Sequence, residues 1–201
     1  MSSERIRASY ERLRAEVGSG VTVVVATKYV GVEGMAALAE AGVEVVGENR
    51  LQDLMTKHDR FADAFRWHFI GHLQSRKVRE VSSLCELLHS LDSLSAAQRL
   101  TIPALVEVNL SGEGSKSGVP PSGLAAFLDQ ARALGVEVRG LMTMPPLSDD
   151  PELSRPYFRE LRRLAGEHGL PELSMGTSQD YRVAVEEGAT FVRIGSALFA
   201  R

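Results

Sequence analysis

Eight short apolar runs that alternate with helical segments constrain the fold of this chain more than any other feature. The runs lie at residues 21–28, 43–49, 67–71, 87–92, 103–110, 136–144, 172–176 and 190–196. The segments between them carry apolar residues at helical spacing, as Leu124, Phe127 and Leu128 illustrate. Strands that alternate with helices form a parallel sheet, and eight such units favour closure into a (β/α)8 barrel of the TIM type over an open doubly wound sheet.

The domain organisation follows from the length. The chain has 201 residues, of which 44% are hydrophobic and 24% charged, and no linker or low-complexity tract divides it. Such a chain is long enough for one barrel. We expect a single domain over residues 1–201, with a charged N-terminal helix in 1–20 and the barrel in 21–201.

Charge and composition exclude several classes of partner. The net charge of −3 provides no basic field for nucleic acid or an anionic membrane. The apolar runs are far shorter than the ~20 residues that span a bilayer, and the charged N-terminus lacks the apolar core of a signal peptide. Cys85 is the only cysteine, so no internal disulfide or cysteine metal cluster is expected. These features favour a cytoplasmic protein with no membrane or nucleic-acid partner.

Polar and small residues gather at the carboxyl ends of the expected strands, where barrel enzymes place their chemistry. The residues at these ends are Lys28, Glu48, Asn49, His72, Asp92, Asn109, Met142, Met144, Gly176, Ser178, Gly195 and Ser196. The opposite ends are ordinary turns such as AGVE and EGAT. The asymmetry predicts a site at the carboxyl edge of the barrel.

Two segments near the C-terminus are suited to binding a phosphate. LSMGTSQD (173–180) leaves the seventh strand through Gly176, and RIGS (193–196) ends the eighth. Glycines let backbone N–H groups approach an anion, and the loops after strands seven and eight form the common phosphate site of such barrels. Alone, the first could be a helix cap and the second a turn. Their place on adjacent strands favours phosphate binding.

Arg193 lies two residues before Gly195, on the same side of the eighth strand. An arginine within an apolar strand needs partners. One interpretation is a structural ion pair with Glu48, Glu107 or Glu137. The other is a donor to a ligand held above the phosphate site.

Lys28 ends the first strand, which barrel closure places beside the eighth. Only four of the 23 basic residues are lysines, and Lys28 shares its side of the strand with Val24 and Ala26, so we expect it to be buried. A desolvated lysine has a depressed pKa and reacts readily with aldehydes. Beside a phosphate site it suggests a Schiff base with pyridoxal 5′-phosphate (PLP) or with a sugar phosphate. The alternative is a strand-end lysine that reaches solvent.

Other candidates carry weaker signals. His68 and His72 have metal-ligand spacing, but the glutamate of an HExxH motif is missing, so no metal is expected. We expect His72 to line the pocket and His68 to lie in the core. Asn49 is a helix cap, a ligand contact or both. Lys116 and the arginine-rich segment 155–163 are interpreted as solvated.

Six segments together resemble the pyridoxal phosphate homeostasis protein family, which is related to the N-terminal domain of alanine racemase. They are VVVATKYV, GENRLQD, WHFIGHLQSRK, VEVNLSGEGSKSG, GLMTMPP and LSMGTSQDYRVAVEEGATFVRIGSALFA. The resemblance implies a PLP-binding barrel of fold type III with an internal aldimine at Lys28. It implies that Asn49 and His72 line the cofactor cavity, that Arg193 faces the pyridine nitrogen, and that Ser178, Gly195 and Ser196 hold the phosphate. Met142, at the end of its strand, is also expected to contact the cofactor.

An arginine at the ring nitrogen has a chemical consequence. It keeps its proton, so the ring nitrogen stays unprotonated and the cofactor is a poor electron sink, which disfavours aminotransferase chemistry. Alanine racemase takes its second base from another domain, and no further segment follows residue 201 in this sequence. We therefore expect a monomeric, non-catalytic protein that buffers PLP and passes it to PLP-dependent apoenzymes. An amino-acid racemase or a Schiff-base aldolase is the alternative.

Overall fold

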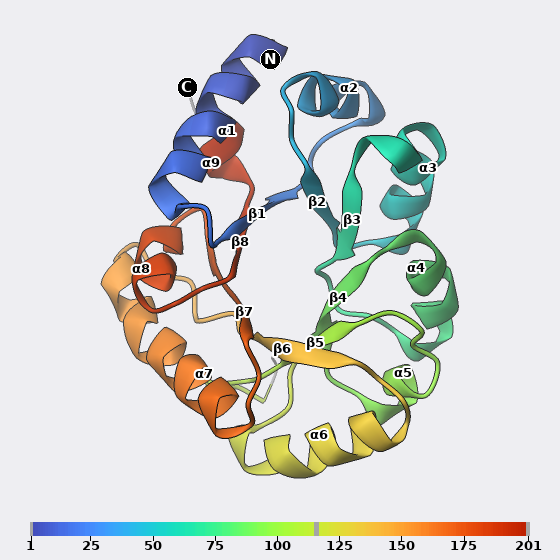
Figure 1. Cartoon of the computed structure of the whole chain (residues 1–201), viewed down its shortest axis with the longest axis vertical. Coiled ribbons are helices and arrows are strands. Elements are labelled where there is room, and N and C mark those ends of the chain that lie inside the picture. The colour runs from blue at the N-terminus through green and yellow to red at the C-terminus, as the bar shows by residue number, and fades with distance from the viewer. Residues whose placement is uncertain (1, 115–116, 200–201) are drawn as a thin grey trace.

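The computed structural model describes residues 2–114 and 117–199, and its eight parallel strands close into a barrel in chain order (Figure 1). The strands are β1 (Thr22–Ala26), β2 (Val45–Glu48), β3 (Arg66–Phe69), β4 (Leu87–Leu91), β5 (Ala104–Glu107), β6 (Val138–Met142), β7 (Glu172–Thr177) and β8 (Phe191–Ile194). Pairing of β1 with β8 closes the barrel and sets Val24 opposite Arg193. The predicted (β/α)8 barrel is confirmed.

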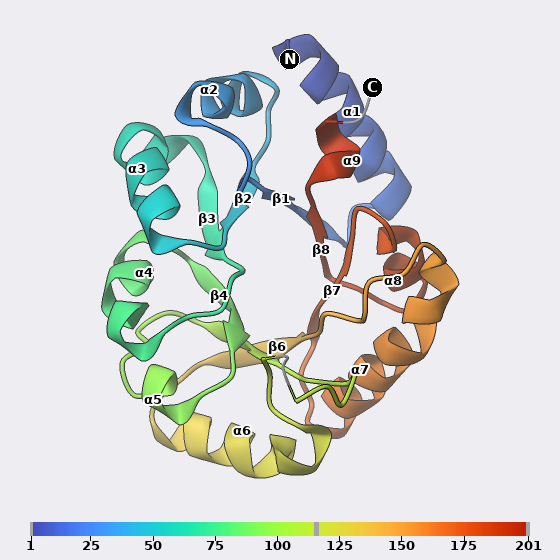
Figure 2. The same cartoon turned by 180° about the vertical axis from the view of Figure 1, so that it is seen from behind.

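Helices surround the barrel on all sides, as the two opposite views show (Figures 1 and 2). They are α1 (Ser3–Val17), α2 (Val32–Glu40), α3 (Leu51–Phe61), α4 (Val78–Leu84), α5 (Leu94–Ala97), α6 (Leu124–Ala133), α7 (Arg155–Glu167), α8 (Tyr181–Glu186) and α9 (Ser196–Phe199). Short 3-10 turns lie at Ala62–Ala64, Ser75–Lys77, Pro121–Gly123 and Pro151–Ser154. Across residues 2–114 and 117–199, no helix has the length and apolarity needed to cross a membrane.

Most strand residues are apolar because both faces of each strand are buried. Val24 faces the barrel interior, in a cluster with Val45, Leu87, Leu105, Met142 and Phe191. Its neighbour Val25 belongs to the larger layer between strands and helices. Both are fully buried, so the alternation between inside and outside leaves no polar stripe in the sequence.

The predicted N-terminal helix is present as α1, which contacts α2, α8 and α9 and lies beside the last helix in Figure 1. Its apolar face buries Ile6, Tyr10 and Leu13. At its C-terminal end Glu16 accepts a hydrogen bond from Arg182 Nη2 at 2.9 Å and another from the hydroxyl of Tyr181. The helix is thereby tied to α8, next to the loops that end β7 and β8.

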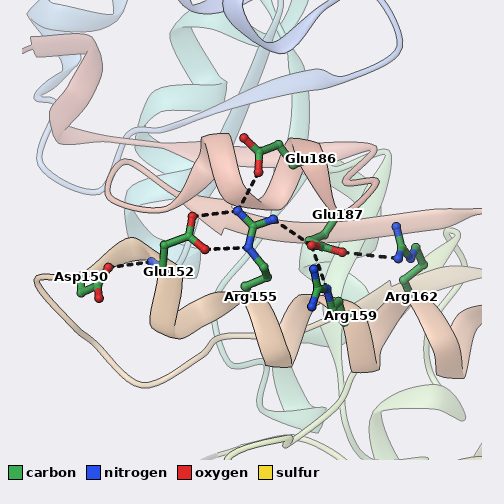
Figure 3. Close-up of polar contacts among 7 residues, drawn as sticks. All are labelled: Asp150, Glu152, Arg155, Arg159, Arg162, Glu186 and Glu187. Atoms are coloured by element: carbon green, nitrogen blue, oxygen red, sulfur yellow. Dashed lines mark hydrogen bonds and ion pairs between the residues drawn. The ribbon is translucent and has the colours of Figure 1, made fainter.

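The arginines of helix α7, expected to be solvated, form ion pairs with neighbouring segments (Figure 3). Glu187, whose side chain is 5% exposed, accepts hydrogen bonds from Arg155 Nη1 at 2.8 Å and Arg159 Nε at 3.0 Å, and lies 3.4 Å from Arg162 Nη2. Arg155 also pairs with Glu152 and Glu186. The hydrogen bond from Arg155 is the main cause that lowers the pKa of Glu187. The arginines therefore fasten α7 to the end of α8.

Candidate functional site

A cavity of about 790 Å³ opens at the carboxyl ends of the strands. It has the size of a small-molecule site. Its lining comes from the ends of β1, β2, β3, β6, β7 and β8: Ala26, Lys28, Tyr29, Val30, Gly31, Gly34, Asn49, Ile70, Gly71, Met144, Thr177, Ser178, Gln179, Arg193, Gly195, Ser196 and Phe199. Six of the eight predicted site residues meet here: Lys28, Asn49, Ser178, Arg193, Gly195 and Ser196.

Lys28 lines the cavity but is not buried, contrary to the expectation from its strand. β1 ends at Ala26, and Lys28 follows in an exposed turn that the bond from Val30 N to Thr27 O closes at 2.8 Å. Its Nζ lies 4.9 Å from the ring centre of Tyr29. The strand stops two residues earlier than predicted, so the amine stands at the mouth of the cavity, in reach of solvent.

The buried lysine of this region is Lys57 in α3, which the sequence analysis passed over. It is 5% exposed, and its Nζ donates to Glu48 Oε1 and to the carbonyl of Thr27 at 2.8 Å. Glu48, fully buried, also accepts from Thr27 Oγ1 at 2.5 Å. The signal was present: Lys57 lies three residues after the buried Leu54, on the inner face of its helix. The ion pair fixes the backbone immediately before Lys28.

The loops after β7 and β8 are joined by one hydroxyl. Ser178 Oγ accepts hydrogen bonds from the backbone N–H groups of Gly195 at 3.0 Å and Ala197 at 3.1 Å. The alternative that this segment is only a helix cap is wrong, because Ser178 bonds across to the next loop. Asp180 shapes the turn by accepting from the N–H of Thr177 at 2.6 Å.

Gly176 permits the sharp exit from β7. Its φ of +88° is one that residues with side chains rarely adopt, and a Cβ there would lie 2.5 Å from the Cβ of Ala184. The glycine therefore allows the loop to turn back over α8 and present Thr177 and Ser178 to the cavity.

Arg193 is 5% exposed and lines the cavity, with neutral partners. It donates from Nη1 to Ser174 Oγ at 2.5 Å and from Nη2 to the carbonyl of Thr143 at 3.0 Å and to Met144 Sδ at 2.8 Å. Burial lowers its pKa to about 10, which leaves it charged at neutral pH.

The predicted alternative of an ion pair for Arg193 is not found within 2–114 and 117–199. Glu48 is paired with Lys57, and Glu107 accepts from Ser117 Oγ at 2.8 Å. The structure thus leaves the charge of Arg193 without a carboxylate in hydrogen-bonding contact, as expected for a group that serves a ligand.

Asn49 supplies a buried acceptor. Its Oδ1 has no hydrogen-bond partner among the described residues, and the side chain lines the cavity. It is not a helix cap, because α3 begins after Arg50. A Cβ on Gly71 would lie 2.4 Å from the carbonyl oxygen of Asn49, so glycine is required where the chain leaving β3 passes. An unpaired buried acceptor at a cavity wall fits a ligand that donates a hydrogen bond.

Two predicted site residues lie outside the cavity lining. Met142 points into the barrel interior, one layer of side chains below the cavity. Met144, two residues further along the chain, lines the cavity instead. The chain has already left the barrel edge at His72, so the side chain of His72 is exposed. Its Nδ1 lies 3.4 Å from Asp92 Oδ2. Lys116 lies outside the described residues. No group of His, Cys, Asp or Glu in the described chain could hold a metal ion.

The barrel interior below the cavity holds polar side chains that the sequence analysis missed. His68 is core, as predicted, but its Nδ1 lies 2.9 Å from His89 Nε2, and His89 Nδ1 lies 2.8 Å from Ser174 Oγ. Polar residues at inward positions of apolar strands are the signal that could have identified them. Together they connect the core to Arg193.

Relatives of this chain share its fold over almost its whole length. The pyridoxal phosphate homeostasis protein of Aquifex aeolicus is 41% identical, across 98% of this chain and 93% of that protein. The structure of PipY from Synechococcus elongatus PCC7942 with PLP bound is 31% identical and matches with a TM-score of 0.89, over 97% of this chain and 100% of that one.

More distant matches indicate the fold alone. Lysine/ornithine decarboxylase from Vibrio vulnificus is 15% identical with a TM-score of 0.76, over 98% of this chain and 62% of the decarboxylase.

A model of the alanine racemase N-terminal domain matches residues 1–201. The chain therefore belongs to the alanine racemase N-terminal domain family, among the relatives known as pyridoxal phosphate homeostasis proteins.

Proposed function

We propose that this protein binds PLP reversibly in the cavity and serves as its carrier, without catalysing a reaction. The observation that carries the proposal is the convergence of a primary amine (Lys28), a charged arginine (Arg193) and the loops after β7 and β8 on one cavity. PLP supplies an aldehyde that condenses reversibly with a primary amine, and an anionic phosphate. The names of the close relatives support the same ligand.

Each lining residue has a role suited to that ligand. Lys28 supplies the amine, and its position at the cavity mouth allows the link to form and hydrolyse. The hydroxyls of Ser178 and Ser196 and the backbone N–H of Ser196 donate to the phosphate, which lies against Gly195, whose own N–H donates to Ser178 Oγ. Arg193 donates to the pyridine nitrogen, and the unpaired Oδ1 of Asn49 accepts a hydrogen bond from the ligand or a bound water.

The composition of the lining supports a carrier over a racemase. Of the described residues that line the cavity, none has a carboxylate, imidazole or thiol. Tyr29 is the one other side chain there that could act as a base, and it lies against Lys28 rather than opposite to it. Racemisation needs a second base on the other face of the cofactor.

The test combines a spectrum with chemical trapping. PLP added to the protein is expected to give an absorbance band near ~420 nm, and borohydride reduction should fix one pyridoxyl group on Lys28, located by peptide mass spectrometry. Lys28→Ala should lose both signals, whereas Lys77→Ala, away from the cavity, should keep them. Absence of the band from the wild-type protein would refute the proposal.

The carrier role has its own test. Incubation with PLP and each D- or L-amino acid should give no racemisation above the Lys28→Ala background. Turnover well above that background would replace the carrier by the racemase.

We further infer that the protein acts as a monomer in the cytoplasm and supplies PLP-dependent apoenzymes. One copy of the chain already forms the cavity. Sedimentation of the PLP-bound protein as a single 21.9 kDa species would support the monomer. Activation of a PLP-dependent apoenzyme faster than free PLP activates it at the same concentration would support the delivery role.

A further inference from the structure

A continuous chain of hydrogen-bonding side chains runs from Arg193 at the cavity into the barrel interior. Arg193 Nη1 lies 2.5 Å from Ser174 Oγ, Ser174 Oγ lies 2.8 Å from His89 Nδ1, and His89 Nε2 lies 2.9 Å from His68 Nδ1. All four residues are buried, and both imidazole rings contact Phe191. Nothing in the proposed function uses the two histidines or Ser174.

The direction of this chain follows from counting protons. A guanidinium only donates, so Ser174 Oγ accepts from Arg193. Among the residues that the structure describes, the one other hydrogen-bond contact of Ser174 Oγ is His89 Nδ1. The hydroxyl proton must therefore go to His89 Nδ1, because the reverse direction would leave a buried O–H without an acceptor.

The tautomers of both histidines are then fixed. His89 accepts at Nδ1, so it carries its proton on Nε2 and donates to His68 Nδ1. His68 in turn carries its proton on Nε2, which is not among the fully buried polar atoms that lack a partner in the described chain. Both rings are neutral: burial lowers the pKa of His68 to about 3 and that of His89 well below its ordinary value.

The chain restricts how Arg193 can present its donors. Nη1 is held by Ser174, and Nη2 by the Thr143 carbonyl and by Met144 Sδ. Of its five N–H bonds, the one on Nε and one on Nη1 have no partner within 2–114 and 117–199. All three acceptors are neutral, so none of them cancels the positive charge that faces the cavity.

We propose that Ser174 and His89 are positioning residues that fix the guanidinium of Arg193 toward the ligand through a one-directional hydrogen-bond chain ending at His68. The direction of the chain stands on contacts within this protein alone. The identity of the ligand that Arg193 meets rests on the proposed function. The two parts can therefore fail separately.

The first experiment tests the direction without any ligand. Long-range ¹H–¹⁵N NMR at pH 7 on protein to which no PLP is added should show His68 and His89 as neutral rings with the proton on Nε2. Variants at each position assign the signals among the five histidines of the sequence. An Nδ1 proton or a charged ring at either residue would overturn the proposal whether or not PLP binds.

The second experiment tests the effect on Arg193 with a matched pair of variants. His89→Asn keeps an acceptor for the Ser174 hydroxyl through its amide oxygen, whereas His89→Leu has nearly the same shape without one. Loss of one positioned hydrogen bond predicts about tenfold weaker PLP binding and a shifted absorbance band for His89→Leu, with His89→Asn close to the wild type. Lys28 should still be trapped by borohydride in both.

The controls separate positioning from folding. Each variant is first checked for a cooperative thermal transition, and the Arg193 Nε–H resonance is followed without ligand. A folded His89→Leu protein with the wild-type Arg193 resonance, PLP affinity and band would overturn the proposal. If His89→Leu does not fold, Ser174→Ala gives the same comparison: the proposal expects weaker PLP binding and a shifted band there too, and wild-type values would overturn it.

Discussion

Replacing Lys57 by methionine tests whether the buried ion pair holds the start of the site together. Methionine keeps the unbranched side chain up to the ε position but removes both bonds of Nζ, one to Glu48 and one to the carbonyl of Thr27. Glu48 is fully buried, and its Oε2 already has no partner among the described residues. The substitution leaves this carboxylate with the hydroxyl of Thr27 as its remaining described partner.

The expected loss of stability follows from those contacts. A hydrogen bond to a charged group contributes about 2 kcal/mol and one to a neutral carbonyl about 1 kcal/mol. Leaving a buried charge without its partner brings the cost to about 3–5 kcal/mol. Since a domain has about 5–15 kcal/mol in total, a loss of about 3–5 kcal/mol is roughly a fifth or more of the free energy of unfolding.

Urea unfolding followed by the fluorescence of Trp67, the only tryptophan and 2% exposed, measures this change. The midpoint should fall with little change in slope. Lys77→Met, which removes a lysine for which the structure shows no ion pair, should stay within about 0.5 kcal/mol of the wild type. The double variant Glu48→Gln/Lys57→Met should recover at least about half of the loss, because no uncompensated charge remains.

Two results would refute the reasoning. A loss below about 1 kcal/mol for Lys57→Met would mean that the pair contributes no more than an exposed one. A double variant no more stable than Lys57→Met would mean that the cost comes from packing and not from the buried charge of Glu48.

Three further predictions concern other parts of the barrel. The arginines lower the pKa of Glu187 below its ordinary 4.5, so its contribution to stability is present above that pH and is lost as the pH falls through the folded value. Wild type and Glu187→Gln should therefore converge in urea midpoint as the pH falls below 4.5, and a constant difference would contradict this. Gly176→Ala should cost at least about 2 kcal/mol in the same assay, since its Cβ would meet Ala184 at a positive φ, and a neutral effect would show that the loop relaxes freely. Cys85 is buried and burial raises its pKa to about 12, so a thiol reagent at pH 8 should label it only at the rate of unfolding; prompt labelling in native buffer would contradict its burial.

The fold and the position of the site could be predicted because they depend on pattern. The alternation of apolar strands with amphipathic helices predicts the barrel. Closure of the barrel then brings residues at the carboxyl ends of β1, β7 and β8 together. Lys28, Ser178 and Arg193 meet at the cavity for that reason. Their roles toward PLP stay predictions.

What failed depends on depth along a strand and on contacts between layers. The periodicity shows which side of β6 a residue faces but not how deep in the barrel it lies. The sequence therefore predicts Met142 as a cavity residue, whereas Met144 lines the cavity. The end of β1 is set by the hydrogen bonds of Thr27 to α3 and to its own turn, which no local pattern reveals. For that reason Lys28 was expected to be buried, while Lys57 is the lysine that is.

The pairing of β1 with β8 has a consequence for synthesis of the protein. Lys28 leaves the ribosome long before Arg193, Gly195 and Ser196 do. The register that sets Val24 opposite Arg193 can form only once β8 has been synthesised. A nascent chain therefore carries the amine of Lys28 long before the cavity can form. PLP capture then reports that the first and last strands have joined, and by mass action the ligand stabilises the finished barrel over any incomplete one.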